Sequence, residues 1–488
     1  MTDMKARLSF FNWTFYTVVF VLFVVFFTHI HPIVPFDSDD WYNIIIERTP
    51  YPSLDYWNPT KVFPERFEPF VAMLAGYLLT PLVGDYICAL TLANALVVTL
   101  FIVIYLLSVQ HYIEASFALS RPVSLALITL FILLHFVVMR TANQCNEYLF
   151  YSYDANCYYH YVIPNMLCAS LVLWLMLHDV RSLHDCRTIA ALIVLTYLAL
   201  CSNLYSVIIL IAYLGAILML DLLHTFRASV SWLAGYLRRN ALFLVVITAW
   251  GIIQWIESSG IRANSYGYLH EPLIYCLKVT VYDFLHIRYN LWFLLIVLSA
   301  LAGAKLLDYR QGRHSLSHVG RHQWTLFLAA GLALSYLILL SSRVEPWYIR
   351  RGDVVFEFAF FFLLLVISAM AYLCRHARLV GWSTPLLILV LLWQANTEGR
   401  TYKDVCEMYP PDLPTSIRIS HDVVQQIREA EAAGLDSVFI RVPKYPDDEN
   451  WPILTSNSAS QYYSRALYKH NQIHREIFTI LIPTYEVE

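Results

Sequence analysis

The sequence predicts a membrane all-α protein: a polytopic bundle of about 11 transmembrane helices, followed by a small α/β domain. Three observations predict this class. Hydrophobic residues make up 58% of the 488 residues and charged residues only 14%, against roughly 45–50% and about 25% in soluble domains. Eleven apolar runs are long or apolar enough to span a bilayer, and none contains a Lys or Arg. The segment 397–488 has a different composition, with 14 acids, 9 bases and several Pro residues.

The charge of the connecting segments predicts the orientation of the spans. The predicted spans are residues 8–30, 86–109, 122–139, 162–178, 188–202, 204–222, 241–257, 290–304, 323–340, 354–373 and 380–396. A twelfth run, Phe70–Val83, is short for a span, and we interpret it as a helix on the membrane surface. The segments assigned to the cytoplasm then hold 14 Lys and Arg in 71 residues, against 10 in 122 residues outside. Because basic loops prefer the cytoplasm, the amino terminus is predicted inside and the carboxyl terminus outside.

Residues 397–488 are predicted to form a separate domain outside the membrane, after a transmembrane domain of residues 1–396. The stretch "SHDVVQQIREAEAAG" has a Ser cap, helix-forming residues and a closing Gly, so it predicts a helix. The stretches "SVFIRV" and "IFTILI" predict strands, with a helix in "SASQYYSRALYKHNQ" between them.

The first external loop, residues 31–85, contains the stretch "DSDDW" with three acids: Asp37, Asp39 and Asp40. Acids beside hydrocarbon are costly, which favours a functional use. One alternative is that they cap a helix, since Asp is a preferred N-cap. Calcium binding is another, but the Gly and Glu positions of an EF-hand loop are absent. Net charge is −3, which gives no indication of a nucleic-acid partner.

The order of the parts resembles the membrane glycosyltransferases of the GT-C superfamily, which use polyprenyl-phosphate sugars as donors. One span is followed by an acidic pair in "DDWY", by the Pro-containing "EPFVAMLAGYLLTPLVGD" and by the span "YICALTLANALVVTLFIVIYLL". Within the superfamily the chain is most similar to the serotype-converting glucosyltransferases of lipopolysaccharide O-antigen. Many members have Glu at the second acidic position, where this chain has Asp40, so the choice of base between the two acids stays open.

The resemblance implies a base on the acceptor side and cations around the departing phosphate. A base accepts the proton of the attacking hydroxyl, and a neighbouring carboxylate raises its proton affinity. We assign Asp39 as the base, with Asp40 or Asp37 orienting the acceptor. Donor phosphate binding is assigned to the segment "SSRVEPWYIRRGD", through the residues Arg343, Tyr348, Arg350 and Arg351. Anchoring of these side chains at the lipid interface is the alternative.

The acceptor sugar is assigned to side chains of the first two external loops: Trp41, Glu47, Glu147, Tyr153 and Asp154. In relatives with pyrophosphate donors, acids of the second loop join the first-loop acid at a metal. Here the many Tyr residues of that loop suit sugar stacking instead, so no metal or other cofactor is expected, although a divalent metal is not excluded. Cys145 and Cys157 are candidates for a disulfide in an oxidising periplasm.

The resemblance therefore implies a glycosyltransferase of the bacterial inner membrane with its active site facing the periplasm. It would move a hexose, which the resemblance implies is glucose, from undecaprenyl phosphate to lipid-linked O-antigen with inversion. A donor synthase and a flippase would be its pathway partners. The alternatives are an O-antigen polymerase or ligase, whose loops lack an early acidic pair, and a lipid or sugar transporter. Transporters place charges at the bilayer midplane, where few occur here.

Overall fold

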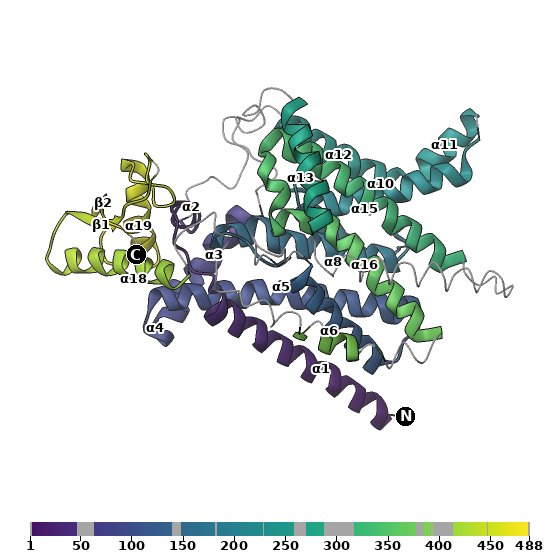
Figure 1. Ribbon diagram of the computed structural model, residues 1–488, viewed down its shortest axis with the longest axis horizontal. Coiled ribbons are helices and arrows are strands. Elements are labelled where there is room, and N and C mark those ends of the chain that lie inside the picture. Colours follow the sequence, from purple (N-terminus) through teal and green to yellow (C-terminus); the bar gives the residue numbers. More distant parts are fainter. Residues whose placement is uncertain are drawn as a thin grey trace. The chain divides into compact units, whose positions relative to one another are not determined.

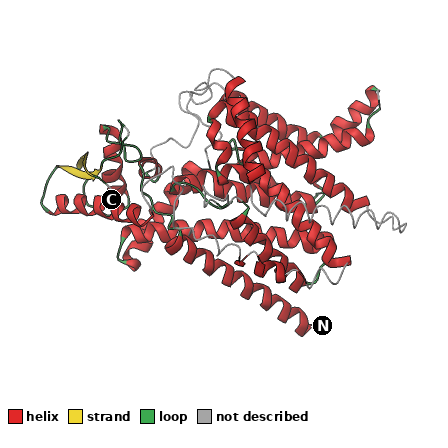
Figure 2. Ribbon diagram, in the orientation of Figure 1, coloured by secondary structure: helices red, strands yellow, loops and turns green. Residues whose placement is uncertain are grey.

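The computed structural model of the chain is mostly helical, with one small sheet (Figures 1 and 2). It describes residues 2–45, 63–138, 148–180, 183–227, 229–257, 270–286, 317–376, 383, 385–390, 392–393, 413–446 and 448–486. The chain forms two compact units, each described here by itself. The first unit comprises Met1–Val103, Ser152–Ile163 and Arg400–Glu488, and the second comprises Ile104–Tyr151 and Pro164–Gly399. One boundary, between Gly399 and Arg400, lies close to the predicted division at residue 396, and the residues after it group with Met1–Val103 and Ser152–Ile163.

Seven helical segments in the described residues are long and apolar enough to cross a membrane. They are Phe11–Ile30, Tyr86–Phe117, Ala155–Leu177, Val207–Thr225, Val230–Glu257, His322–Val344 and Gly352–Arg375. Two shorter apolar helices are α6 (Arg121–Val137) and α9 (Cys186–Leu200). The predicted span 290–304 lies outside the described residues, and 380–396 is described only in part. The predicted mostly helical architecture is confirmed, and the seven long apolar segments are compatible with a membrane protein.

Several of these segments are built from more than one helix. The first consists of α1 (Thr2–Val25) and the π-helical turn η1 (Phe26–Ile30), and the second is α5 (Tyr86–Phe117). The third segment consists of α7 (Ala155–Cys157), η3 (Tyr158–Val162) and α8 (Ile163–Leu177), and the fourth is α10 (Val207–Thr225). The fifth consists of α11 (Val230–Arg239) and α12 (Ala241–Glu257). The sixth lies in α15 (Ser317–Val344) and the seventh in α16 (Gly352–His376). Helix α13 (His270–His286) and the 3₁₀ turn η6 (Pro346–Arg350) complete the second unit.

Where residues 31–85, the predicted first external loop, are described, they contain short helices of the first unit. Helix α2 covers Ser38–Asn43, and α3 (Pro64–Leu74), the π-helical turn η2 (Ala75–Leu79) and α4 (Thr80–Val83) follow one another without a break. This stretch is not one of the seven long apolar segments, yet it exposes the apolar side chains of Phe70, Leu78 and Leu82. It ends at Gly84, whose φ of +82° is a backbone conformation that favours glycine.

The carboxyl-terminal residues form the predicted order of helix, strand, helix and strand. These elements are α18 (Leu413–Ala432), β1 (Ser437–Pro443), α19 (Asn457–Lys469) and β2 (Phe478–Tyr485). The two strands are parallel, with Ser437 paired to Phe478 and Ile440 to Leu481. A parallel pair needs a crossover connection, and α19 provides it. The small α/β fold expected from the sequence is present.

This carboxyl-terminal fold packs directly on the first external loop (Figure 1). The ring of Trp41 in α2 lies 4.9 Å from that of Tyr463 in α19, measured between centroids. The Tyr86 hydroxyl and Nδ1 of His470 are hydrogen-bonded at 2.6 Å. At Gly76 a Cβ atom would lie only 2.7 Å from Cβ of His470, so glycine permits the close approach. The loop that carries the three acids therefore shares a core with the end of the chain.

Candidate functional site

Five acids from three separate segments gather in the first unit. They are Asp37, Asp39 and Asp40 of the first loop, Glu68 of α3 and Asp154 before α7, and we call them the acidic cluster. Their negative charges act on one another: Asp37 is influenced by Asp39, Asp40 and Asp154, and Glu68 by Asp39, Asp40 and Asp154. The structure thus brings together the first-loop acids and one of the second-loop acids that the sequence analysis considered separately.

Asp37 is the N-cap of α2. Its backbone is extended, with φ of −84° and ψ of 172°, and its carboxylate oxygen Oδ1 accepts a hydrogen bond from the backbone N–H of Asp40 at 2.7 Å. Capping satisfies one of the backbone donors that a helix start leaves without a partner. The capping alternative raised from the sequence therefore describes Asp37, while Asp39 and Asp40 lie inside the helix that it caps.

The Asp40 carboxylate joins the first two external loops. Its side chain is 0% exposed. Atom Oδ2 accepts from the backbone N–H of Phe36 at 2.9 Å, and Oδ1 accepts from that of Asn156 at 2.7 Å. Asp154 caps the same turn, because its carboxylate accepts from the backbone N–H of Cys157. Two carboxylates thus hold the start of α7 in place against α2.

Glu68 is buried without a hydrogen-bond partner. Its side chain is 2% exposed, and neither carboxylate oxygen has a partner in the described part of the chain. The neighbouring Phe67 ring lies 6.0 Å from that of Tyr159. The Tyr159 hydroxyl donates to Oδ1 of Asn94 at 2.8 Å, and Nδ2 of Asn94 donates to the carbonyl oxygen of Ile33 at 3.2 Å. Packing and polar contacts therefore fix the surroundings of Glu68 while leaving its carboxyl group unpaired.

The sequence analysis did not single out Glu68, although the stretch "EPFVAMLAGYLLTPLVGD" begins with it. The available signal was an acid placed between Phe67 and Pro69, in a helix whose other residues are largely apolar. A buried polar group without a partner costs free energy, so its presence calls for a functional reason.

Burial and mutual repulsion raise the pKa of three carboxyl groups in the cluster. Burial is the larger cause for Asp37, Asp40 and Glu68, and it carries the pKa of each well above its ordinary value. The negative charge of Asp40 adds to the effect on Asp37 and Glu68, and that of Asp154 adds to the effect on Asp40. Hydrogen bonds from the backbone N–H groups of Asn156 and Phe36 act in the opposite direction on the pKa of Asp40. Each of these three carboxyl groups therefore keeps its proton to a higher pH than an ordinary carboxyl group does.

Asp39 differs from the other first-loop acids because it is partly exposed. Its carbonyl oxygen accepts a hydrogen bond from Nδ2 of Asn43 at 2.9 Å. Within the described residues its carboxylate has no hydrogen bond or ion pair. Of the three predicted catalytic acids, Asp39 is therefore the one whose carboxylate is both accessible and uncommitted to holding the backbone.

The residues assigned to the acceptor sugar lie in different surroundings. Trp41 is fully buried against Tyr463, which gives its ring a packing role at the contact with the carboxyl-terminal fold. Tyr153 and Asp154 are partly exposed. Glu47, Glu147 and Cys145 lie outside the described residues, and so does the proposed disulfide. Tyr153 and Asp154 remain the described side chains that an acceptor can reach.

The arginines assigned to the donor phosphate belong to the second unit. Arg343 lies in the last turn of α15 and Arg350 ends η6, and both are exposed. Arg351 is only 4% exposed, so a phosphate reaches it less easily than it reaches the other two arginines. Its Nε and Nη2 atoms donate to the two carboxylate oxygens of Asp353 at 3.0 and 2.7 Å. Its guanidinium lies over the Tyr348 ring, 4.7 Å from the centroid, so Tyr348 packs on a cation that is already paired.

A further acid lies near this buried pair. Glu357 is 0% exposed one turn after Asp353 in α16, and neither carboxylate oxygen has a hydrogen-bond partner among the described residues. Nearby, Nδ2 of Asn165 donates to the carbonyl oxygen of Asp353 at 2.7 Å. The Tyr205 and Tyr348 rings lie 5.9 Å apart. An acid buried in a membrane helix is by default a candidate functional residue.

Metal-ligating side chains converge at one other place in the described residues. Asp85, Cys88 and His421 have ligand atoms within 4.8 Å of one another, and this group does not include any member of the acidic cluster. Carboxyl groups such as those of the acidic cluster can exchange protons and form hydrogen bonds with hydroxyl groups. Carboxylates with raised pKa values are suited to accept a proton from a sugar hydroxyl at neutral pH.

Comparison of the chain with protein-family models, with curated protein sequences and with solved structures found no match.

Proposed function

We propose that this protein is a membrane glycosyltransferase that moves a hexose from undecaprenyl phosphate to a lipid-linked O-antigen unit, with inversion. The acceptor hydroxyl oxygen attacks the anomeric carbon as its proton passes to the Asp39 carboxylate. The bond between that carbon and the phosphate oxygen breaks, and undecaprenyl phosphate leaves with the electron pair. The sugar, the lipid carrier and the acceptor come from the resemblance of the sequence to GT-C enzymes.

One observation carries this proposal: the acids near Asp39 hold the backbone in place, while Asp39 itself is accessible. Asp37 caps α2, Asp40 accepts from Phe36 and Asn156, and Asp154 caps α7. A general base must reach its substrate and be held in a fixed position. The neighbouring negative charges favour proton uptake by Asp37, Asp40 and Glu68.

The packing of the first unit supports the proposed orientation in the membrane. Because Trp41 contacts Tyr463, the first external loop and the carboxyl-terminal fold lie on the same side of a bilayer. Ten of the 11 predicted spans lie between these two segments in the sequence. Because ten is an even number, the chain returns to the same side of the membrane. Counting Phe70–Val83 as a further span would place the two segments on opposite sides. The surface-helix interpretation of that run avoids this conflict.

Arg350 and Arg343 are the proposed ligands of the donor phosphate. Both are exposed, and their guanidinium groups can bind phosphate oxygens in pairs. Arg351 has a different role in this proposal. It is paired with Asp353 and shapes the segment that presents Arg350.

The test is transfer by the purified full-length protein in lipid vesicles. The donor is undecaprenyl-phosphate-linked glucose, and the acceptor is a lipid-linked O-antigen unit analysed by mass spectrometry. We expect the acceptor to gain the mass of one hexose, and the Asp39→Asn variant to give little product. Joining of whole O-antigen units would identify a polymerase or ligase instead. Movement of either lipid across the vesicle membrane with no new bond would identify a transporter, and both outcomes overturn the proposal.

A further inference from the structure

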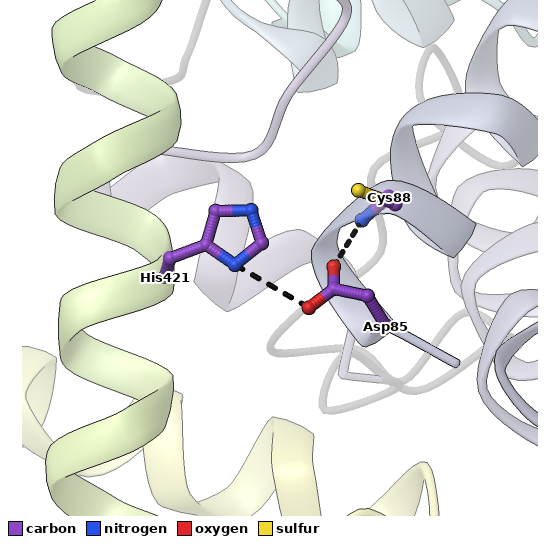
Figure 3. A group of neighbouring side chains, drawn as sticks. All are labelled: Asp85, Cys88 and His421. Carbon is purple, nitrogen blue, oxygen red and sulfur yellow. Dashed lines mark hydrogen bonds and ion pairs between the residues drawn. The ribbon is translucent and has the colours of Figure 1, made fainter. Parts of the chain in front are cut away.

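Three metal-ligating side chains meet where α5 begins beside α18, both in the first unit. Asp85 precedes α5, Cys88 lies three residues later on the same helical face, and His421 extends from α18. Figure 3 shows the three side chains converging from these two elements. None of them belongs to the acidic cluster, and the proposed glycosyl transfer does not use them.

The spacing of the three ligand atoms is compatible with binding of one metal ion. One ligand atom from each residue lies within 4.8 Å of the other two. Nδ1 of His421 and Oδ2 of Asp85 are 3.4 Å apart, beyond the roughly 2.7–3.2 Å typical of an N–H···O hydrogen bond. Around a tetrahedral zinc ion, with bonds of about 2.0–2.1 Å to nitrogen and oxygen, two such ligand atoms lie about 3.3 Å apart. The observed separation of 3.4 Å is close to that distance.

The Asp85 carboxylate is held in an orientation that suits a ligand. The backbone N–H of Cys88 donates to its Oδ1 atom at 2.7 Å, as the dashed line in Figure 3 marks. That bond directs Oδ2 toward His421. Hydrogen bonds from outside the ligand set commonly orient metal-binding groups in this way. Cys88 is exposed and the other two side chains are partly exposed, so solvent can supply a fourth ligand.

We propose that Asp85, Cys88 and His421 bind a zinc ion, with a water molecule as the fourth ligand. A thiolate, an imidazole and a carboxylate together form a ligand set typical of zinc, whereas magnesium and calcium prefer oxygen ligands alone. The ion would connect the carboxyl-terminal fold to the first residues of α5. Because a metal that binds only the folded protein stabilises it, zinc would strengthen this contact.

The test uses the full-length protein purified with its thiols reduced, stripped of metal with a chelator and titrated with Co²⁺. We expect one Co²⁺ per chain and a sulfur-to-cobalt charge-transfer band in the near ultraviolet. Zn²⁺ should displace the Co²⁺ and raise the melting temperature. Cys88→Ser should abolish the band, and Asp85→Asn or His421→Ala should weaken binding on the order of tenfold or more.

Two matched variants serve as controls for other exposed ligands. Cys186→Ser removes an exposed thiol in the second unit, and His474→Ala removes an exposed imidazole of the carboxyl-terminal fold. Both should bind Co²⁺ as the unmodified protein does. If the unmodified protein takes up no Co²⁺ or Zn²⁺, or if Cys88→Ser shows the same band and affinity, the proposal is overturned. Asp85 would then cap the start of α5 and form an ion pair with His421, without a metal ion.

Discussion

The Oδ1 atom of Asp40 accepts a hydrogen bond from the backbone N–H of Asn156, at 2.7 Å and 116 residues further along the chain. Through this contact α2 and the start of α7 are held together in the first unit. The other oxygen of the same carboxylate accepts from Phe36 at 2.9 Å, so both oxygens have a structural role. Asp40 is therefore an acid of the cluster whose side chain also holds two backbone segments together.

Asp40→Asn should therefore destabilise the protein. An amide side chain offers one oxygen, so one of the two buried N–H groups would lose its acceptor and face an NH₂ group. Leaving a buried donor without a partner costs about 1–3 kcal/mol. The measurement is thermal unfolding in detergent, and Asp37→Asn is the control, because Asn caps a helix as well as Asp does. Equal melting temperatures for the two variants would contradict the role assigned to Asp40.

Arg351→Ala should reduce stability, whereas Arg350→Ala should not. Arg351 and Asp353 are 4% and 1% exposed, so removing the arginine leaves a buried carboxylate without its partner. Breaking a buried pair in this way costs about 3–5 kcal/mol. Membrane abundance and unfolding temperature measure the loss. The double variant Arg351→Ala/Asp353→Ala should regain part of it, because the uncompensated charge is then removed.

The matched Arg350→Ala variant separates donor binding from folding. Arg350 is exposed, and exposed substitutions usually change stability by less than about 0.5 kcal/mol. The loss of a charge-assisted phosphate contact should instead raise the donor concentration needed for half-maximal transfer. A normal rate at limiting donor would place the phosphate site away from Arg350.

Glu68→Gln should change how stability depends on pH. Because the pKa of Glu68 is raised in the folded protein, the folded state holds a proton that the unfolded state releases above the ordinary glutamate pKa. Stability should therefore fall as the pH rises from about 4.5 toward the folded-state value. The Gln variant stays neutral, so its melting temperature should exceed that of the unmodified protein at neutral pH and vary less with pH.

The exposed Glu486 provides the control for this experiment, since Glu486→Gln should leave the pH profile unchanged. Asp37 and Asp40 also have raised pKa values, so part of the slope should persist in Glu68→Gln. A lower melting temperature at neutral pH in the Gln variant would mean that Glu68 is ionised and paired in the folded protein. If transfer falls while stability rises, Glu68 is retained for function at the expense of stability.

The carboxyl terminus should lie outside the cytoplasm. The contact between Trp41 and Tyr463 requires the first loop and the carboxyl-terminal fold to share one side, and the basic segments place that side outside. A phosphatase fused after Glu488 should be active, and one fused after Arg239 should be inactive. Activity in the reverse pattern would invert the proposed topology and move the candidate active site to the cytoplasm.

Local patterns in the sequence were enough to predict the helices and the carboxyl-terminal fold. Long apolar runs predict the long helices, and Gly434 marks the end of α18, although that helix begins at Leu413 and not at the predicted Ser420 cap. The cost of acids beside hydrocarbon singled out Asp37, Asp39 and Asp40 as a group that needs an explanation. Such patterns do not show that Asp37 caps the helix, that Asp40 accepts from two backbone N–H groups or that the Asp39 carboxylate is accessible.

Other features of the site depend on contacts between distant parts of the chain. Asp40 meets Asn156 only because α2 packs beside α7, and no local pattern carries that pairing. Glu68 lies in a helix with several exposed apolar residues, so helical periodicity did not reveal its burial. The sequence does not show that Nε and Nη2 of Arg351 donate to the carboxylate of Asp353, two residues later.

Asp39→Asn tests the proposed base directly. The substitution keeps the size of the side chain and removes its ability to accept a proton at neutral pH. If Asp39 is the base, the variant should reach normal membrane abundance and lose roughly 10²–10⁴-fold in transfer rate, the usual contribution of a positioned general base. Because Asp37 provides the cap, α2 should be as stable in this variant as in the unmodified protein.

Asp37→Asn is the matched control, since it changes a neighbouring acid to the same amide and keeps the cap. We expect its transfer rate to fall much less than that of Asp39→Asn. Both are measured as hexose added to lipid-linked O-antigen at equal protein abundance. A fully active Asp39→Asn would remove Asp39 from the mechanism. If Asp40→Asn, compared at equal amounts of folded protein, were the inactive variant instead, the base would be the buried acid that Asn156 and Phe36 hold in place.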